Sequence, residues 1–311
     1  MFNMHESCPL CHSVQIELFH EYPSFSLISC KDCDLVFRPH LDQLNAIEIV
    51  TDIYDADWVA MRNQYAKKTF TEHAIFNILL LEMWCPAKGK LLEIGPGTGE
   101  MLYLAREAGW QVIGVEPSPA SCAYAHDRYG LQLIHSLWDA SVLDEELKGS
   151  FDAIVFWHVL EHISNPKQYL EELKEFLKPG GKILFSVPNK KSFTNELLGV
   201  YSPLYTESDH LFHYSRNNLQ SLLQQGAWQV LTIFSREETN RLESHLQKIT
   251  GLTDLPLTDI MRLSVMLQSA FQGHEIFCIA TQQSQNTTMN EQEVNNADEE
   301  TQADSFHGCE K

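Results

Sequence analysis

Four cysteines near the amino terminus have the spacing of a metal site. Cys8 and Cys11 form one C-x-x-C pair, and Cys30 and Cys33 form a second, eighteen residues further on. Two such pairs are typical of a zinc ribbon, in which four thiolates surround one tetrahedral ion. Because four thiolates complete the shell, the expected zinc is structural and not catalytic. The alternative, two redox dithiols, fits less well because neither pair opens a helix in a βαβ unit.

A glycine-rich turn in the middle of the chain is the second candidate site. Gly95, Gly97 and Gly99 follow the apolar residues 90–94 and precede a predicted helix that begins at Glu100. Alternate glycines remove the Cβ atoms that would keep a ligand away from the backbone. The first N–H groups of the helix point over the turn. The pattern therefore predicts a site for a nucleotide-like ligand.

Spacing and two acids distinguish this turn from a dinucleotide site. The dinucleotide fingerprint is G-x-G-x-x-G, whereas the glycines here are spaced G-x-G-x-G. Glu93 stands in the strand just before the turn, where it would repel a pyrophosphate and attract a cation. Glu116 ends the next predicted strand, about twenty residues past the first glycine, where a carboxylate usually accepts both ribose hydroxyls. We expect a ligand that combines positive charge with a nucleoside.

These motifs resemble those of the class I S-adenosylmethionine-dependent methyltransferases. The first motif of that family is similar to residues 93–99, and its second ends in an acid like Glu116. Residues 151–162 resemble the fourth strand and following loop of the family, and residues 177–184 resemble the turn into its fifth strand. The resemblance covers residues 8–280 and implies S-adenosylmethionine as the cofactor.

The resemblance also implies where the cofactor lies. Glu93 should contact the methionine end and Glu116 the ribose, while residues 136–138 should border the adenine through backbone N–H groups and apolar contacts. For Trp138, ordinary core packing is an equally good alternative. The expected cofactor-binding residues are Glu93, Gly95, Pro96, Gly97, Thr98, Gly99, Glu116, Pro117, Ser118, Ser136, Leu137, Trp138 and His158.

Methyl transfer needs the acceptor held near the sulfonium, and a base where the nucleophile carries a proton. His158, Glu161 and His162 follow the fourth predicted strand and should face the sulfonium, while His210 and His213 come from a later insert. Histidine titrates near neutral pH. Many family members share the Glu-His pair whatever they methylate, so a structural role, in which His162 bonds nearby backbone, stays open. Some similar quinol O-methyltransferases hold a divalent cation with acids here, but His158 replaces one of them.

Alternating strands and helices should position these residues. Such alternation predicts an α/β fold with a Rossmann-like, doubly wound sheet whose ligands bind at the carboxyl ends of the strands. Two late apolar segments are expected to add the sixth and seventh strands, the last one antiparallel, a hairpin that dinucleotide-binding domains generally lack. The seven predicted strands are residues 90–94, 111–116, 131–137, 151–158, 182–187, 228–234 and 274–280.

The segment before the sheet has mostly helical periodicity. Residues 44–84 predict two or more helices, and in the methyltransferases such a segment commonly covers the cofactor. Tyr54, Trp58 and Tyr65 are therefore expected lid residues, although packing of the ribbon against the core is an equally good role for them. The expected buried face of the later helix consists of Phe70, Ala74, Ile75, Ile78, Leu79 and Glu82.

Two inserts interrupt the second half of the sheet. Residues 189–215 are rich in aromatics and are expected to build the acceptor pocket, and residues 241–272 contain two helical patterns. The aromatic residues are Phe193, Tyr201, Tyr205, Phe212 and Tyr214. The predicted organisation is a ribbon (1–42), a helical lid (43–87), a methyltransferase domain (88–282) and an acidic disordered tail (283–311).

Composition limits the partners. A formal net charge of -20 argues against a broad phosphate-binding surface, because nucleic-acid affinity depends on Lys and Arg. No signal pattern and no apolar run long enough to span a bilayer are visible, so we expect a cytoplasmic protein with no membrane insertion.

Three hypotheses about function follow from the sequence. The first is an enzyme that methylates a small molecule such as a sugar, a quinol or a natural-product intermediate. The second is an RNA methyltransferase that uses the ribbon for RNA, but residues 8–33 contain only one lysine. The third is an inactive cofactor-binding adaptor, which predicts a damaged glycine turn that residues 93–99 do not show.

Overall fold

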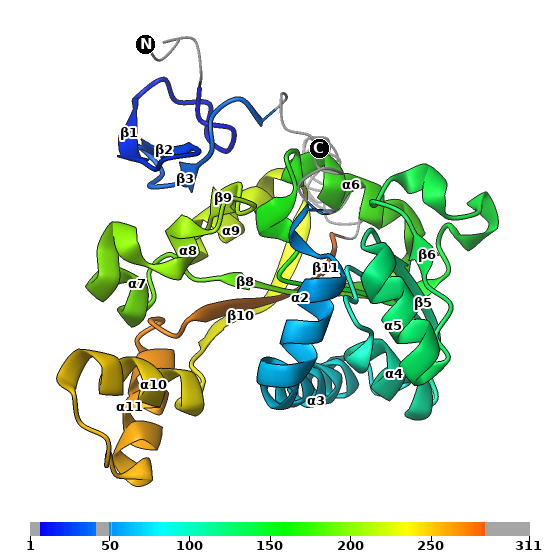
Figure 1. Cartoon of the computed structure of the whole chain (residues 1–311). Coiled ribbons are helices and arrows are strands. Elements are labelled where there is room, and N and C mark those ends of the chain that lie inside the picture. The colour runs from blue at the N-terminus through cyan, green and yellow to red at the C-terminus, as the bar shows by residue number, and fades with distance from the viewer. Residues whose placement is uncertain (1–6, 42–49, 51, 284–311) are drawn as a thin grey trace, which may run out of the picture.

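A seven-stranded sheet is the centre of the computed structural model, which describes residues 7–41, 50 and 52–283 (Figure 1). The strand order is β10-β11-β8-β7-β4-β5-β6, and β11 runs antiparallel to both of its neighbours. This confirms the predicted sheet and its antiparallel hairpin. The strands are β4 (Lys90–Ile94), β5 (Gln111–Glu116), β6 (Ile134–His135), β7 (Phe151–Trp157), β8 (Leu177–Pro188), β10 (Trp228–Arg236) and β11 (Glu275–Gln282).

Helices cover both faces of this sheet. Many begin at side-chain caps: Ser118 and Asn165 each accept a backbone N–H and are followed by proline, and Ser215 forms a capping box with Asn218. The helices are α2 (Ala56–Met61), the π-helix η2 (Arg62–Ala66), α3 (Lys67–Trp84), α4 (Glu100–Glu107), α5 (Pro119–Tyr129), α6 (Pro166–Phe176), α7 (Phe193–Leu198), α8 (Pro203–Thr206), α9 (Arg216–Gln225), α10 (Thr239–Thr250) and α11 (Leu257–Ser269).

The alternation of side chains along β7 divides the core into two layers. Ile154 and Phe156 point to one face, where α6 and α9 pack, and the Phe156 ring stacks on Phe185 at 4.8 Å. Ala153 and Val155 point to the other face, where α3, α4 and α5 pack. Both faces are therefore apolar, as is usual for a parallel sheet.

A second, smaller sheet contains Cys30, and the other three ribbon cysteines lie in the turns beside it. Its order is β1-β2-β3-β9, in which β1 (Ile16–Glu21), β2 (Ser26–Cys30) and β3 (Val36–Phe37) come from the amino terminus. The fourth strand, β9 (Phe212–His213), comes from the insert after β8. We call residues 7–41 the ribbon. The ribbon thus shares a sheet with the methyltransferase part of the chain.

Among the predicted strands, β6 and β8 differ most from the structure. Only Ile134 and His135 form β6, because this is the edge strand and Leu131 instead turns into the core. The expected turn at 177–181 belongs to β8, since Leu177 already pairs with Phe151 and the glycines sit in an irregularity of the strand.

The predicted buried face of α3 is partly wrong. Ala74 and Ile78 are buried, but Ile75 and Leu79 are exposed, and Leu81 takes their place. The helix lies against α4 along the stripe through positions 74, 78 and 81, which leaves 75 and 79 on the outer side.

Three further predictions concern the late insertion, the start of the lid and the tail. The 241–272 insertion contains α10 and α11, as its two helical patterns predict. The start of the lid and the acidic tail, residues 42–49 and 284–311, lie outside the described residues. Within the described part of the chain, no helix has the length and apolarity that crossing a bilayer requires.

Candidate functional site

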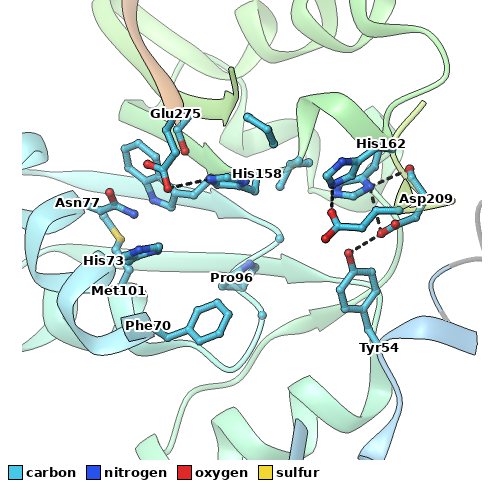
Figure 2. A pocket seen from close by; sticks show the side chains of 18 of the residues that line it. Tyr54, Phe70, His73, Asn77, Pro96, Met101, His158, His162, Asp209 and Glu275 are labelled. Atoms are coloured by element: carbon cyan, nitrogen blue, oxygen red, sulfur yellow. Dashed lines mark hydrogen bonds and ion pairs between the residues drawn. The ribbon is translucent and has the colours of Figure 1, made fainter. Parts of the chain in front are cut away.

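One cavity of about 1190 Å³ opens at the carboxyl ends of β4, β5 and β7 (Figure 2). It extends from the glycine turn to the histidines that follow β7. Four parts of the chain contribute to its wall: the lid, the ends of the parallel strands, the insert after β8, and the β10–β11 edge. Representative lining residues are Tyr54, Arg62, Glu93, Gly97, Glu116, His158, His162, Asp209, Glu238 and Glu275.

The glycine turn requires glycine at its first and last positions. Gly95 and Gly99 have φ angles of 68° and 86°, a region that side chains disfavour. A Cβ on Gly95 would lie 2.7 Å from Val159, and one on Gly99 would lie 2.8 Å from Leu131. The turn can therefore pack this closely against the next strands only without side chains.

Glu93 is a buried acid whose Oε2 has no hydrogen-bond partner among the described residues. Burial, with repulsion from Glu100 and Glu116, raises its pKa to about 8. A buried carboxylate that borders a cavity and lacks a counterion fits a ligand with a positive charge. This is the feature expected for the cationic end of S-adenosylmethionine.

Glu116 is held rigidly at the end of β5. Its Oε2 accepts the N–H of Gly97 and its Oε1 accepts the N–H of Ser118, each at 2.8 Å. Burial raises its pKa to about 7, although the two N–H donors act in the opposite direction. Each oxygen has a further lone pair, so the carboxylate is arranged to accept two hydroxyl groups from the cavity.

Most of the predicted cofactor residues line the cavity, and four do not. Thr98 is fully buried and its hydroxyl donates to Glu100, while Gly99 caps α4. Ser118 caps α5, and its hydroxyl donates to the Tyr54 carbonyl. Ser136 pairs β6 with β5 through its backbone N–H. The predicted residues on the cavity wall are Glu93, Gly95, Pro96, Gly97, Glu116, Pro117, Leu137, Trp138 and His158.

Trp138 lies between the cavity and the core. It borders the cavity, and its ring also contacts Phe176 and Tyr169 edge to face at 5.6 and 6.4 Å. It can present one edge to a ligand while the core holds the other.

An ion pair that the sequence did not suggest joins η2 to α4. Arg62 of η2 donates two hydrogen bonds, both 2.9 Å, to the carboxylate of Glu100 at the start of α4. Its guanidinium also lies over the Phe70 ring at 3.7 Å. The two partners are 38 positions apart, so no local pattern links them. Of the expected lid aromatics, Tyr54 and Trp58 line the cavity, whereas Tyr65 is exposed.

His158 lies between two buried acids. Its Nδ1 is 3.4 Å from Glu161 Oε1. Its Nε2 is 3.2 Å from Glu275 Oε1 (Figure 2). Burial favours the neutral ring, but the two carboxylates outweigh it and raise its pKa to about 10. His158 is therefore a cation at neutral pH, suited to donate hydrogen bonds and not to accept a proton. Its φ of 54° is unusual for a non-glycine residue and marks a constrained position.

His162 has a different arrangement, in which Nδ1 is hydrogen-bonded and Nε2 has only the longer contact of 4.0 Å to Glu161. Its Nδ1 is 2.9 Å from the backbone oxygen of Asp209 and 3.5 Å from Asp209 Oδ2. Because a carbonyl oxygen only accepts, the proton of a neutral ring resides on Nδ1, which leaves the Nε2 lone pair available. Tyr54 donates to Asp209 Oδ2 at 2.7 Å. Residues 54, 162 and 209 thus form one network at the cavity (Figure 2).

Glu161 does not reach the cavity. It is fully buried behind the two histidines, and its Oε1 lies 4.0 Å from His162 Nε2. Burial would raise its pKa, but the hydrogen bond from His158 and the nearby histidines lower it. It is placed to hold His158, not to meet a substrate.

The 189–215 insert lines the cavity, but its aromatic side chains do not. Tyr201 is exposed, Phe193 packs on α10 and α11, and Tyr205, Phe212 and Tyr214 are buried against the ribbon or the core. His213 is buried on β9 away from the cavity, whereas His210 lines it. The insert instead contributes mostly polar side chains: Ser192, Asn195, Pro203, Leu204, Glu207, Asp209, His210 and Leu211.

The four ribbon cysteines converge on one point. Their sulfur atoms lie within 4.8 Å of one another, with Cys8 and Cys33 at 3.5 Å and Cys11 and Cys30 at 3.5 Å. Two turns bring them together, and the backbone N–H of Cys30 bonds the oxygen of Leu35. Four thiols at this separation fit a tetrahedral zinc ion.

The sheet order, the glycine turn and the paired acids Glu93 and Glu116 define a class I S-adenosylmethionine-dependent methyltransferase. A family model described as "Methyltransferase domain" matches residues 65–233, which is more than half of the chain. The chain belongs to this methyltransferase family.

Similar proteins agree with this assignment. The ubiquinone biosynthesis O-methyltransferase of Idiomarina loihiensis is 32% identical over 114 residues, a match that covers 36% of this chain and 46% of that protein. The chain thus spans less than half the length of this relative.

Two solved structures share the fold. A chain of the complex between the Haloferax volcanii Trm112 methyltransferase activator and a methyltransferase has a TM-score of 0.53 and 18% identity, covering 76% of this chain and 99% of that one. Haemonchus contortus phosphoethanolamine N-methyltransferase 2, solved with phosphomonomethylethanolamine and S-adenosylhomocysteine, has a TM-score of 0.52 and 17% identity, covering 78% and 61%. At these identities the likeness concerns the fold alone.

Proposed function

We propose that the chain transfers a methyl group from S-adenosylmethionine to a small polar acceptor. The observation that carries this proposal is the continuity of the cavity: one space borders Glu93 and Glu116 at one end and His158, His162 and Asp209 at the other. A cofactor and an acceptor bound there would be neighbours, as in-line displacement requires.

The cofactor end uses the acids as expected from the sequence. Glu93 takes the methionine end, Glu116 takes both ribose hydroxyls, and Leu137 and Trp138 border the adenine. The N–H groups and small surface of Gly95 and the following turn let the ligand approach the backbone. When bound, S-adenosylmethionine supplies an electrophilic methyl group on a sulfonium, so the protein has mainly to hold the acceptor and receive its proton.

His162 is the proposed base. Asp209 and Tyr54 fix its ring with Nδ1 protonated, so Nε2 accepts the proton that the acceptor loses as it forms the bond to the methyl carbon. His158, held as a cation by Glu161 and Glu275, places a positive charge beside the acceptor, because both of its ring nitrogens face these carboxylates. The structural alternative for His162 is compatible with this role, because the backbone bond occupies only one nitrogen.

The polarity of the acceptor end favours a hydroxylated acceptor, such as a sugar or a polar natural-product intermediate, over a quinol with an isoprenoid tail. An apolar tail would need an apolar channel. Charged and polar side chains dominate this end instead: His73, Glu207, Asp209, His210, Arg236, Glu237, Glu238, Arg241, His274 and Glu275.

The experiment is a transfer assay with methyl-labelled S-adenosylmethionine and a panel of sugars, phenols, quinols and RNA, with S-adenosylhomocysteine as a second readout. We expect label in a hydroxylated small molecule. Label only in RNA, or in no acceptor class although the cofactor binds, would reject the proposal.

We also propose that Cys8, Cys11, Cys30 and Cys33 hold one structural zinc ion. The proposal rests on the convergence of the four sulfurs. Four thiolates complete the shell, which leaves the ion no position for a substrate.

The pH dependence of cofactor binding follows from Glu93. Its pKa is about 8 in the free protein, so binding a cation beside it must release a proton below that pH. We expect the affinity for S-adenosylhomocysteine, whose ammonium group carries the charge, to rise about fivefold between pH 7 and 8 and then to level off. Calorimetry at several pH values measures both the affinity and the released proton.

Glu93→Gln gives the control. It should weaken binding and remove most of this pH dependence, leaving only the smaller contribution of Glu116. The same variant should melt higher than the parent at pH 8 without cofactor. The raised pKa of Glu93 lowers the free energy of unfolding of the parent. This loss of stability is absent below the ordinary pKa of 4.5, grows as the pH rises, and is complete above about 8. An unchanged pH dependence in Glu93→Gln would contradict this role.

A further inference from the structure

The ribbon is joined to the acceptor side of the cavity by a strand pair. β3 and β9 run antiparallel, with Val36 opposite His213 and Phe37 opposite Phe212. β9 directly follows Asp209, His210 and Leu211, all of which line the cavity. The ribbon therefore adds a strand to the segment that carries the partner of His162, a connection that a flexible linker would not provide.

Arg38, the residue after β3, extends this connection on both sides of Asp209. Its backbone N–H donates to the Leu211 oxygen at 2.9 Å, and its guanidinium donates to the Ser208 oxygen. From the opposite side, the Leu211 N–H donates to the Glu161 oxygen at 2.8 Å. Residues 208–211 are thus held between the ribbon and the loop that carries His158 and His162.

Side chains continue the same contact. Leu27 and Val36 of the ribbon pack on Leu204 and Tyr205 of α8, and Leu204 lines the cavity on its other side. His210 Nδ1 in turn lies 3.2 Å from the Leu204 oxygen. In Figure 1, β9 and α8 accordingly lie between the ribbon strands and the large sheet.

Hydrogen bonds and ion pairs also connect the cysteine site to α9 and to the residues just after β8. The Cys33 oxygen accepts the Asn218 side-chain N–H at 2.8 Å, and Asn218 forms the capping box that starts α9. The neighbouring Asp34 forms ion pairs with Lys190 and Lys191, at 2.7 and 2.9 Å, just after β8. Any change that loosens the cysteine turns also loosens both ends of the insert.

We propose that the ribbon is a positioning element of the acceptor site: through β3 and Arg38 it holds residues 208–211 so that Asp209 stays on His162. Its metal-bound state then controls the candidate base without touching the cofactor end. The consequence for catalysis rests on the proposed function, but the positioning does not. Arg38 is a positioning residue, since it touches neither the cavity nor a ligand.

Hydrogen exchange by mass spectrometry tests the positioning without an acceptor. We compare the zinc-loaded protein, the same protein after a strong chelator, and Arg38→Ala, with Lys31→Ala as matched control. Lys31 is an exposed ribbon residue whose side chain forms an ion pair with Glu17 of β1, on the ribbon side away from β9. We expect exchange at 203–214 to accelerate about tenfold after chelation and in Arg38→Ala, and not in Lys31→Ala. Exchange at 90–118 and the affinity for S-adenosylhomocysteine should stay unchanged.

The tautomer of His162 provides the readout specific to positioning. Nitrogen NMR of histidine-labelled protein, assigned with His162→Gln, should show a single Nδ1–H form in the parent and a mixture in Arg38→Ala. Arg38→Lys, which can still donate to Ser208, should restore the single form.

The outcomes separate the two proposals. Unchanged exchange at 203–214 and an unchanged His162 tautomer in Arg38→Ala would overturn the positioning role, as would a loss of S-adenosylhomocysteine binding that shows general unfolding. Absence of methyl transfer in the acceptor panel, with these shifts present, would count against the proposed function alone.

Discussion

His162→Gln is expected to lower the rate of methyl transfer about 10²–10⁴-fold, the usual contribution of a general base. Glutamine has a similar length, and its amide cannot take the proton from the acceptor. His162 contacts neither Glu93 nor Glu116, so the affinity for S-adenosylhomocysteine should remain that of the parent. The measurement is the single-turnover rate with the acceptor identified in the panel, together with calorimetry.

Two further variants make this result specific. His126→Gln removes an exposed histidine on α5 and should change nothing. Asp209→Asn should reduce the rate less than His162→Gln, because it loosens the ring without removing the base. Full activity of His162→Gln would reject a histidine base at this position. A large fall in melting temperature with an unchanged rate would show that its role is structural.

The second large effect concerns the cysteines. Protein prepared without chelator should contain one zinc ion per chain, and Cys8→Ser/Cys30→Ser should contain none. Apparent binding free energies of structural zinc sites are about 10–16 kcal/mol, so the small ribbon core should not remain folded without the ion. Elemental analysis and thermal melting are the measurements.

Cys122→Ser is the matched control, because Cys122 lies on α5 away from the four ribbon sulfurs. It should retain zinc and melt close to the parent. Zinc retained by the double variant would show that these cysteines do not hold it. Absence of zinc from the parent protein would also contradict the zinc site.

The features predicted most accurately from the sequence are those that depend on neighbouring residues. β4 and β5 have the predicted bounds because each is a short apolar run that ends at a turn, and the glycines at 95, 97 and 99 supply the positive φ angles of the turn after β4. The cysteine spacing brought four sulfurs together for a similar reason, since each pair occupies one tight turn.

Contacts between distant segments could not be predicted. The bond from His162 to Asp209 joins positions 47 apart, and the bond from Tyr54 to Asp209 joins positions 155 apart. Composition also does not show whether an aromatic side chain faces the cavity or packs on the ribbon or the core. The insert 189–215 lines the cavity, but its aromatics at 205, 212 and 214 pack on the ribbon and the core, and polar side chains face the cavity instead. Burial, not aromatic content, determines which residues a ligand meets.

The central claim is that the cavity binds S-adenosylmethionine between Glu93 and Glu116, and calorimetry tests it most directly. Titration of the purified chain with S-adenosylhomocysteine should show one site. Glu116→Ala should weaken it by roughly 1–3 kcal/mol through the loss of two buried hydroxyl bonds, and NAD should give no heat of binding. Binding of NAD without binding of S-adenosylhomocysteine would contradict the account.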